Sequence, residues 1–280
     1  MRHIKLYLFP LGLTVLWGLC SISCSDNNGV GYTETVEDTT EILRSTQMDR
    51  LDNILGDIVI DAYTTYELYE TGRNAQSLLL SDCVTVTITA EQNVREISID
   101  FGSEGCIVRG NLLKGHIDIT YSRFPDLQEV LINYSLRNFY FNSKSVEATR
   151  TILKERANDN GNPMFTHNLD INIIWPNGAS ASRQGVKIRE WVEGAGSVIF
   201  SDNVFEVTGN WTTSFVNGNS NSYQILEPLR REVICTYFVS GSVSIERTNF
   251  GGVFDYGNGD CDNLATLTYN NGQEISITLD

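Results

Sequence analysis

Histidine is scarce in this chain, because its 280 residues include only His3, His116 and His167. A serine triad would need a histidine beside an acid and an exposed serine, and no sequence pattern marks such a serine. The HExxH, GxSxG, GxxxxGKS/T and CxxC motifs, which carry metal, acyl-transfer, nucleotide and thiol chemistry, do not occur. We therefore assign no catalytic residue, expect no cofactor, and interpret the protein as non-enzymatic.

Basic residues are also few. The chain has 20 Lys and Arg against 35 Asp and Glu, which gives a formal net charge of −15. Nucleic-acid binding needs clustered basic side chains that neutralise phosphates, so a nucleic-acid partner is not expected. An acidic surface also repels anionic lipid headgroups, so contact with a membrane is expected only through an attached lipid.

Long hydrophobic runs are missing except at the N-terminus, where Leu6 to Leu19 follow Arg2 and Lys5. This run is shorter than the roughly 20 residues of a membrane-spanning helix, and Pro10 interrupts it. A basic start, a short apolar run and small residues before a cut site are typical of a signal peptide. We predict that residues 1–23 are removed, which changes the net charge from −15 to −17 because two basic residues leave.

Cys24 follows the predicted cut site directly. Ser23 supplies the small residue that lipoprotein processing requires, although Ser21 departs from the aliphatic residue preferred two positions earlier. We predict that Cys24 is the mature N-terminus and carries acyl chains such as palmitate. These would anchor an outer-membrane lipoprotein of the cell envelope, facing the periplasm or exposed at the surface. The alternative is ordinary cleavage after Ser23 and secretion.

The segment after Cys24 is polar and acidic. Residues 25–41, SDNNGVGYTETVEDTTE, contain five acids and no Lys or Arg. Such a composition buries too little apolar surface to fold, so residues 24–41 are predicted to form a flexible acidic tether. Residues 42–280 then form a helix plus a β-domain. Residues 154–163, KERANDNGNP, are either an internal domain boundary or a long loop.

Six cysteines are present, and four remain after signal removal and lipidation of Cys24. An even number in an exported protein predicts two disulfides, for which three connectivities exist. Proximity in sequence favours Cys83–Cys106 and Cys235–Cys261.

The two cysteine pairs enclose similar sequences, which supports this pairing. Each first cysteine opens a strand-like run, and the units end in DFGSEGC and DYGNGDC, where Asp, an aromatic residue, Gly and Cys recur at the same spacing. Gly102 and Gly257 supply backbone freedom for a turn, and Asp100 and Asp255 are predicted to accept hydrogen bonds from turn amides. The alternative is a calcium site, whose spacing matches no known loop motif. Its candidate ligands are Asp255, Asn258, Asp260 and Asp262.

These units, the C-terminal run CDNLATLTYNNGQEIS and the SDNN segment after Cys24 resemble lipoproteins of Bacteroidota whose activity is uncharacterised. The resemblance covers the signal peptide, residues 83–123 and residues 233–280. It implies an envelope location and a β-rich fold, and it brings no functional residues with it.

Hydrophobic periodicity predicts one helix and many strands. Residues 35–62 are predicted to be helical, with a core-packing stripe made of Leu51, Ile54, Leu55, Ile58, Val59 and Ala62. From Cys83 onward the period is two, and asparagine- and glycine-rich turns separate the strands. We predict an all-β fold, an antiparallel meander of about a dozen strands with one N-terminal helix. It would form a sandwich or a curled half-barrel.

The β-domain has three tryptophans, whose rings are candidates for ligand contact. Trp175 and Trp211 share faces with apolar residues and are assigned to the core. Trp191 falls on the same strand face as Lys187 and Arg189, so it is the candidate for an exposed aromatic that contacts a ligand such as a sugar or peptide. The alternative is that it shields a sheet edge or belongs to a second buried layer. Of the histidines, His116 is expected on a polar strand face and His167 is expected to cap or pack at the start of a strand.

Three functions follow from the sequence. The first is an envelope lipoprotein whose β-domain has a structural or binding role, with an envelope protein as one type of partner. The second is a carrier of a lipid or other hydrophobic ligand in a half-barrel. The third is a glycan-binding or glycan-processing module, since the 35 acids offer many carboxylate pairs.

Overall fold

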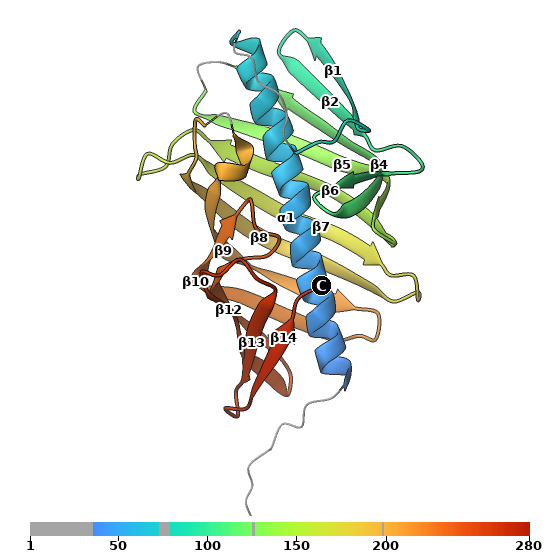
Figure 1. Ribbon diagram of the computed structural model, residues 1–280, viewed down its shortest axis with the longest axis vertical. Helices are drawn as coiled ribbons and strands as arrows, with labels where there is room; N and C mark the ends of the chain where they lie inside the picture. The colour runs from blue at the N-terminus through green and yellow to red at the C-terminus, as the bar shows by residue number, and fades with distance from the viewer. Residues whose placement is uncertain (1–35, 73–78, 125–126, 198) are drawn as a thin grey trace, which may run out of the picture. The chain divides into compact units, whose positions relative to one another are not determined.

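An antiparallel sheet of 14 strands packs against one long helix, α1 (Figure 1). The computed structural model describes residues 36–72, 79–124, 127–197 and 199–280, which lie in one structural unit. The predicted signal peptide, Cys24 and the tether up to residue 35 lie outside the described residues. The expected class, all-β and antiparallel with an N-terminal helix, is confirmed.

The sheet is a meander, because nearly every strand pairs with its neighbours in the sequence. Strand β3 pairs only with the first residues of β4, and β2 pairs with the later part of β4. Among the described strands, β1 and β14 are the two edges and do not pair with each other. The strands are β1 (Thr85–Glu91), β2 (Val94–Asp100), β3 (Cys106–Val108), β4 (Asn111–Ser122), β5 (Glu129–Phe141), β6 (Lys144–Glu155), β7 (Met164–Ile174), β8 (Ser180–Glu193), β9 (Val204–Phe215), β10 (Ser220–Glu232), β11 (Ser240–Arg247), β12 (Phe250–Asn258), β13 (Leu264–Tyr269) and β14 (Glu274–Thr278).

Short turns connect the strands where the sequence predicts them. Turns fall at residues 142–143, 176–178, 217–219 and 270–272. Asn142 and Gly178 have positive φ, which asparagine and glycine adopt more readily than other residues. Residues 156–163 form a loop between β6 and β7, and Glu155 pairs with Met164 across it. Of the segment 154–163, Lys154 and Glu155 thus belong to β6 and the remaining residues form the loop between two paired strands of one sheet.

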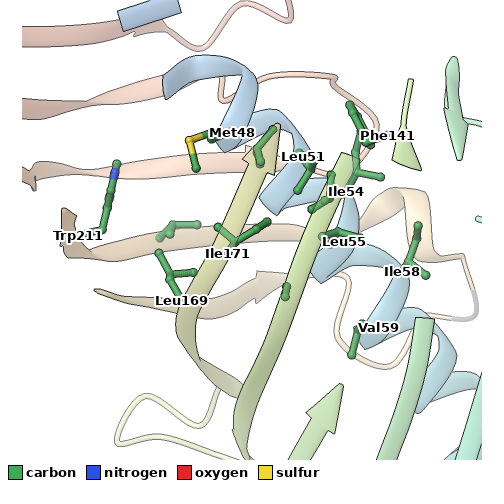
Figure 2. Close-up of a cluster of buried hydrophobic side chains, with 14 of the residues drawn as sticks. Met48, Leu51, Ile54, Leu55, Ile58, Val59, Phe141, Leu169, Ile171 and Trp211 are labelled. Atoms are coloured by element: carbon green, nitrogen blue, oxygen red, sulfur yellow. The ribbon is translucent and has the colours of Figure 1, made fainter. Parts of the chain in front are cut away.

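Helix α1 (Val36–Glu70) is buried far more completely than one apolar stripe predicts. Every residue from 51 to 63 is buried, including the predicted stripe. Leu51, Leu55 and Val59 lie among the side chains of the sheet (Figure 2). The inner face of the sheet, defined as the face that contacts α1, therefore covers the helix on more than one side.

The helix starts within one residue of the predicted start at residue 35, whereas the predicted tether boundary and the predicted helix end differ from the structure. The helix begins at Val36, so the last six residues of the expected tether 24–41 are helical. Glu41 is buried there and accepts hydrogen bonds from Asn217 and Asn219, which lie in the turn between β9 and β10. The helix also continues to Glu70, beyond the predicted end at residue 62, because its C-terminal turns pack against the sheet as well.

Acidic side chains of α1 pair with basic side chains of the inner face. Asp49 binds Arg183 Nη1 at 2.6 Å and Lys187 Nζ at 2.9 Å. Asp52 binds the same Lys187 at 3.1 Å and also Arg150. These five side chains are almost fully buried, so each cation needs its carboxylate to offset the cost of leaving water.

Asp57 joins parts of the sheet that are far apart in sequence. Its Oδ1 lies 3.0 Å from Arg189 Nη1 on β8, and its Oδ2 lies 2.7 Å from Arg231 Nη2 on β10. The same Oδ2 lies 3.0 Å from Nη1 of Arg109, in the turn between β3 and β4. The neighbouring Gly56 gives Arg189 room, because a Cβ there would meet its guanidinium at 2.9 Å.

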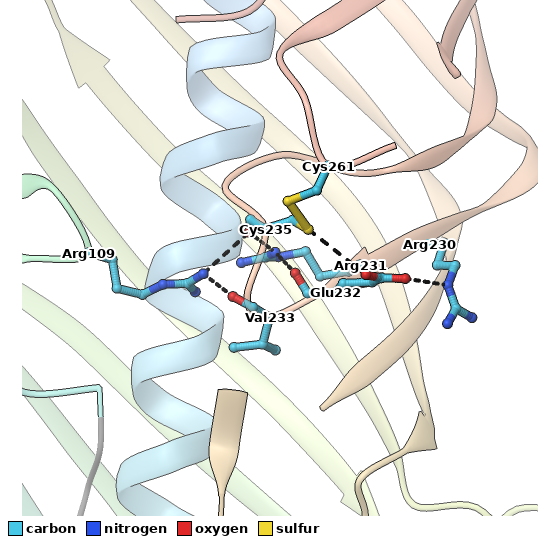
Figure 3. The surroundings of a disulfide bond; sticks show 7 residues. All are labelled: Arg109, Arg230, Arg231, Glu232, Val233, Cys235 and Cys261. Carbon is cyan, nitrogen blue, oxygen red and sulfur yellow. Dashed lines mark hydrogen bonds and ion pairs between the residues drawn. A yellow bond between two sulfur atoms is a disulfide. The ribbon is translucent and has the colours of Figure 1, made fainter. Parts of the chain in front are cut away.

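Arg109 and Arg231 extend this junction to the second cysteine unit. Both guanidinium groups donate hydrogen bonds to the carbonyl oxygen of Cys235 (Figure 3). Arg109 also donates to the carbonyl oxygen of Val233. The turn that follows Cys106 and the segment that carries Cys235 therefore meet beside Asp57.

Both predicted disulfides are present, Cys83–Cys106 and Cys235–Cys261. Each first cysteine precedes a hairpin, β1–β2 or β11–β12, and each bridge closes that hairpin's ends. Asp100 accepts a hydrogen bond from the amide of Gly102 at 2.7 Å, and Asp255 accepts one from Gly257 at 2.7 Å. The two units thus repeat the predicted turn in the same geometry.

Titratable groups at the inner face have shifted pKa values. Burial opposes the charge of Asp52, but Arg150 and Lys187 outweigh it and hold the pKa of that carboxyl well below its usual value. Burial, followed by the charges of Arg189 and Arg150, lowers the pKa of His167 well below its usual value. His167 is therefore a neutral, packed residue inside β7, as the packing alternative for it predicts.

We predict that Asp57→Asn lowers the free energy of unfolding by about 3–5 kcal/mol, because it leaves buried guanidinium groups without a compensating charge. Urea denaturation followed by circular dichroism measures this loss. Glu96→Gln is the matched control, since Glu96 is exposed on β2 and its loss should cost less than about 0.5 kcal/mol. Equal losses in the two variants would contradict a structural role for the Asp57 junction.

We predict a specific pH dependence from His167. Its pKa is lower in the folded than in the unfolded chain, so the unfolded chain binds a proton below about pH 6.5 that the native state excludes. Stability is complete above that pH and falls by up to about 1.4 kcal/mol per pH unit below it. Asp52, whose pKa is also lowered, loses its contribution only below about pH 4.

His167→Gln should remove this slope. Urea midpoints at pH 7.5 and 5.5 should differ less in the variant than in the wild type, by about 1.4 kcal/mol when expressed as free energy. The facing charges Arg150, Lys187, Arg189 and Asp52 are retained in both proteins. An unchanged pH slope in the variant would show that His167 is protonated inside the folded protein.

Candidate functional site

The outer face of the sheet, opposite α1, carries an open polar groove of about 610 Å³ over strands β2, β4 and β5. This volume falls in the range of small-molecule binding sites. The groove is lined by Asp100, Gly102, Ser103, Lys114, Gly115, His116, Asn138, Tyr140, Asn142 and Ser143.

Strand register brings the polar side chains of this groove into rows. Asp100 on β2 lies opposite His116 on β4, and His116 lies opposite Arg137 on β5. His116 Nε2 is 3.3 Å from Asp100 Oδ1. One step along the strands, Lys114 lies opposite Tyr140. Side chains directly opposite each other on one face are close neighbours, so these groups form a continuous polar surface.

A second row continues this surface beyond the groove. Asp118 lies opposite Ser98 on β2 and accepts a hydrogen bond from its hydroxyl at 2.6 Å. Arg137 Nε donates to Asp118 at 3.0 Å. Burial opposes the charge of Asp118, but the hydrogen bonds from Arg137 and Ser98 outweigh it and lower the pKa of that carboxyl. Asp118 therefore stays a carboxylate and neutralises Arg137.

A backbone irregularity shapes the middle of the groove. The β4–β5 register shifts between Lys114 and His116, where Gly115 has φ 82° and Asn138 has φ 50°. A Cβ on Gly115 would lie 2.1 Å from the carbonyl oxygen of Asn138, so only glycine allows this close approach. Such bulges redirect side chains and are frequent beside binding sites.

Tyr140 is the exposed aromatic side chain of the groove. It is 43% exposed, while its neighbours Phe139 and Phe141 point to the inner face and are buried. Its position on the outer face follows from the period-two alternation of β5. Tyr140 is not among the residues predicted to contact a ligand, although its place between two core phenylalanines is the signal in the sequence that could have identified it.

The hypothesis that Trp191 is an exposed ligand contact is wrong. Trp191 is only 6% exposed and packs between Phe165 and Phe205 on the inner face. Lys187 and Arg189 do share its face as predicted, but that face is buried, because their charges pair with acids of α1. A charged strand face is usually exposed to solvent, but this one is buried because α1 supplies the opposite charges.

The other predicted tryptophans are in the core. Trp211 is buried, and its ring stacks on Tyr223 with Lys187 Nζ 4.4 Å from its centroid. Trp175 is buried, and its indole N–H donates to Gln47 on α1 at 2.8 Å. Both tryptophans therefore support the contact between the helix and the sheet.

The calcium candidates do not form a cluster. Asp255 accepts from the Gly257 amide and Asp262 accepts from the Leu264 amide, so both carboxylates serve their local turns. Within the described residues, no group of three or more His, Cys, Asp and Glu side chains is arranged to hold a metal ion. Asn258 and Asp260 are exposed beside the Cys235–Cys261 bridge.

We predict that Gly115→Ala closes part of the groove and destabilises the fold. Alanine at positive φ costs about 1–2 kcal/mol, and the contact with the Asn138 carbonyl adds about 1–3 kcal/mol of strain. Gly178→Ala is the matched control, because Gly178 has the same φ of 82° with no atom within 4 Å of a Cβ. Chemical denaturation should give the larger loss for Gly115→Ala, and equal losses would contradict a close approach at the bulge.

Comparison with known proteins gives no assignment for this site. No protein-family model matches the sequence, and no curated protein or solved structure matches it either. The function is therefore argued from the residues of this chain.

Proposed function

We propose that this protein is a lipid-anchored component of the cell envelope whose β-domain binds a ligand or partner on its outer face. The anchor is an acylated Cys24 after removal of residues 1–23, and the membrane is the outer membrane. The domain acts by binding and not by catalysis. The short acidic segment between Cys24 and α1 connects the lipid to the domain.

The disulfides support an extracytoplasmic location. Cys83–Cys106 and Cys235–Cys261 are both bridged, and structural disulfides persist in oxidising compartments. Among the residues that the structure describes, no helix has the length and hydrophobicity needed to cross a bilayer. An attached lipid would supply membrane contact without such a helix.

The burial of α1 carries the proposal that binding takes place on the outer face. Helix residues 51–63 occupy the middle of the inner face, and the cavity between α1 and strands β9–β12 measures about 10 Å³. That is room for roughly one water molecule. An apolar hollow between the C-terminal end of α1 and β1–β2 measures about 200 Å³, below the usual range of small-molecule sites. A lipid carried against the inner face would have to displace the helix and separate its buried ion pairs, so the carrier alternative is not the function we propose.

We predict that Cys24→Ala abolishes lipid labelling. In cells of a bacterium with lipoprotein processing enzymes, the wild type should incorporate tritiated palmitate and sediment with membranes. The variant should lose both properties, because the thiol that accepts the acyl chain is gone. Cys20→Ala is the matched control and should keep the label. Equal labelling of wild type and Cys24→Ala would show that Cys24 is not the acylated residue, and absence of label from both would leave a secreted protein without a lipid anchor.

A further inference from the structure

We propose that the outer-face groove is a saccharide-binding site, with Tyr140 as the stacking residue and the Asp100–His116 pair and Lys114 as hydrogen-bonding partners for sugar hydroxyls. This inference rests on the proposed binding role of the outer face and names the chemical class of the ligand. It does not depend on the lipid anchor.

The first argument is the placement of one aromatic ring among polar groups. Tyr140 is 43% exposed and lies opposite Lys114, at one side of the groove. The face of an aromatic ring is electronegative, so it attracts the slightly positive C–H groups on one side of a sugar ring. A single exposed ring surrounded by donors and acceptors suits a ligand with an apolar face and polar edges, which a pyranose has.

The second argument is the mixture of donors and acceptors. A sugar hydroxyl both donates and accepts, so its site needs both kinds of group. Asp100 offers carboxylate oxygen, Lys114 offers an ammonium group, and Asn138 offers an amide with both functions. Asp100 is 43% exposed at its side chain, so it remains accessible although it contacts His116.

The charge balance of the groove separates this ligand class from others. Lys114 and Asp100 carry opposite charges, and Arg137 beside them is already bound to Asp118. A phosphate site would need several free cations, and an apolar ligand would need an apolar lining. The groove has no cluster of free cations, and its apolar surface comes from the Tyr140 ring and from carbon atoms of polar and glycine residues, with no aliphatic side chain in the lining. Neutral or weakly acidic saccharides fit such a mixed surface of nearly balanced charge.

The third argument is that the backbone is distorted at the groove. Gly102, Gly115, Asn138 and Asn142 all line it and all have positive φ. Gly102 and Asn142 lie in turns, where positive φ is ordinary for these residues, whereas Gly115 and Asn138 lie at the bulge inside the sheet. Bulges of this kind redirect side chains and are frequent beside binding sites. The register shift separates the Lys114–Tyr140 pair from the His116–Arg137 pair.

The test is an oligosaccharide array that contains neutral and uronic-acid-containing glycans, probed with the full mature protein in detergent. The oligosaccharide with the strongest signal is then titrated by calorimetry into wild type, Tyr140→Ala, Tyr140→Phe and Lys114→Ala. We expect Tyr140→Ala to weaken binding at least tenfold, because the stacking ring is lost. Tyr140→Phe should stay within about threefold of wild type, since it keeps the ring.

Tyr69→Ala is the matched control, because Tyr69 is 68% exposed at the end of α1, outside the groove. It should leave binding unchanged, and all variants should keep the wild-type circular dichroism spectrum. The proposal is overturned if no arrayed glycan binds, or if Tyr69→Ala weakens binding as much as Tyr140→Ala. The array is repeated with the Cys24→Ala protein, which should bind the same glycan. Saccharide binding is thereby tested separately from acylation of Cys24.

Discussion

The fold depends on a buried carboxylate at the centre of α1. Asp57 accepts hydrogen bonds from three arginines that belong to β8, to β10 and to the turn after β3. Two of these arginines also hold the carbonyl oxygen of Cys235. One helix side chain thus connects β8 and β10 with the turn between β3 and β4, and it joins the segments that carry Cys106 and Cys235.

Buried ion pairs contribute less to net stability than to geometry, because the cost of removing charges from water offsets much of their attraction. An apolar helix packed against an apolar sheet could rotate or slide with little loss of stability, because apolar contacts are not directional. Asp49, Asp52 and Asp57 meet their cations only in one register of helix against sheet. We infer that the ionic contacts specify where the helix lies, while the apolar side chains around them supply the burial.

Because α1 covers the middle of the inner face, our proposal places binding on the outer face. The same period-two alternation that directs Phe139 and Phe141 inward directs Tyr140 outward. The bulge at Gly115 and Asn138 then breaks this regularity at the place where polar side chains of three strands converge. The same strands therefore pack their inner side chains against α1 and present the polar groove on their outer face.

The sequence by itself determined the all-β class, the antiparallel order of the strands and the turns, because these depend on spacing between neighbours in the chain. It favoured, among three connectivities, the disulfide pairing that the structure has. It also identified the apolar stripe of α1. Only the tertiary structure decided which face of β8 is buried, since Lys187 and Arg189 find their partners on a helix more than 130 residues away. It likewise decided that Trp191 is buried and Tyr140 exposed. A local pattern reports polarity, whereas burial of a charge depends on whether a distant segment brings the opposite charge to it.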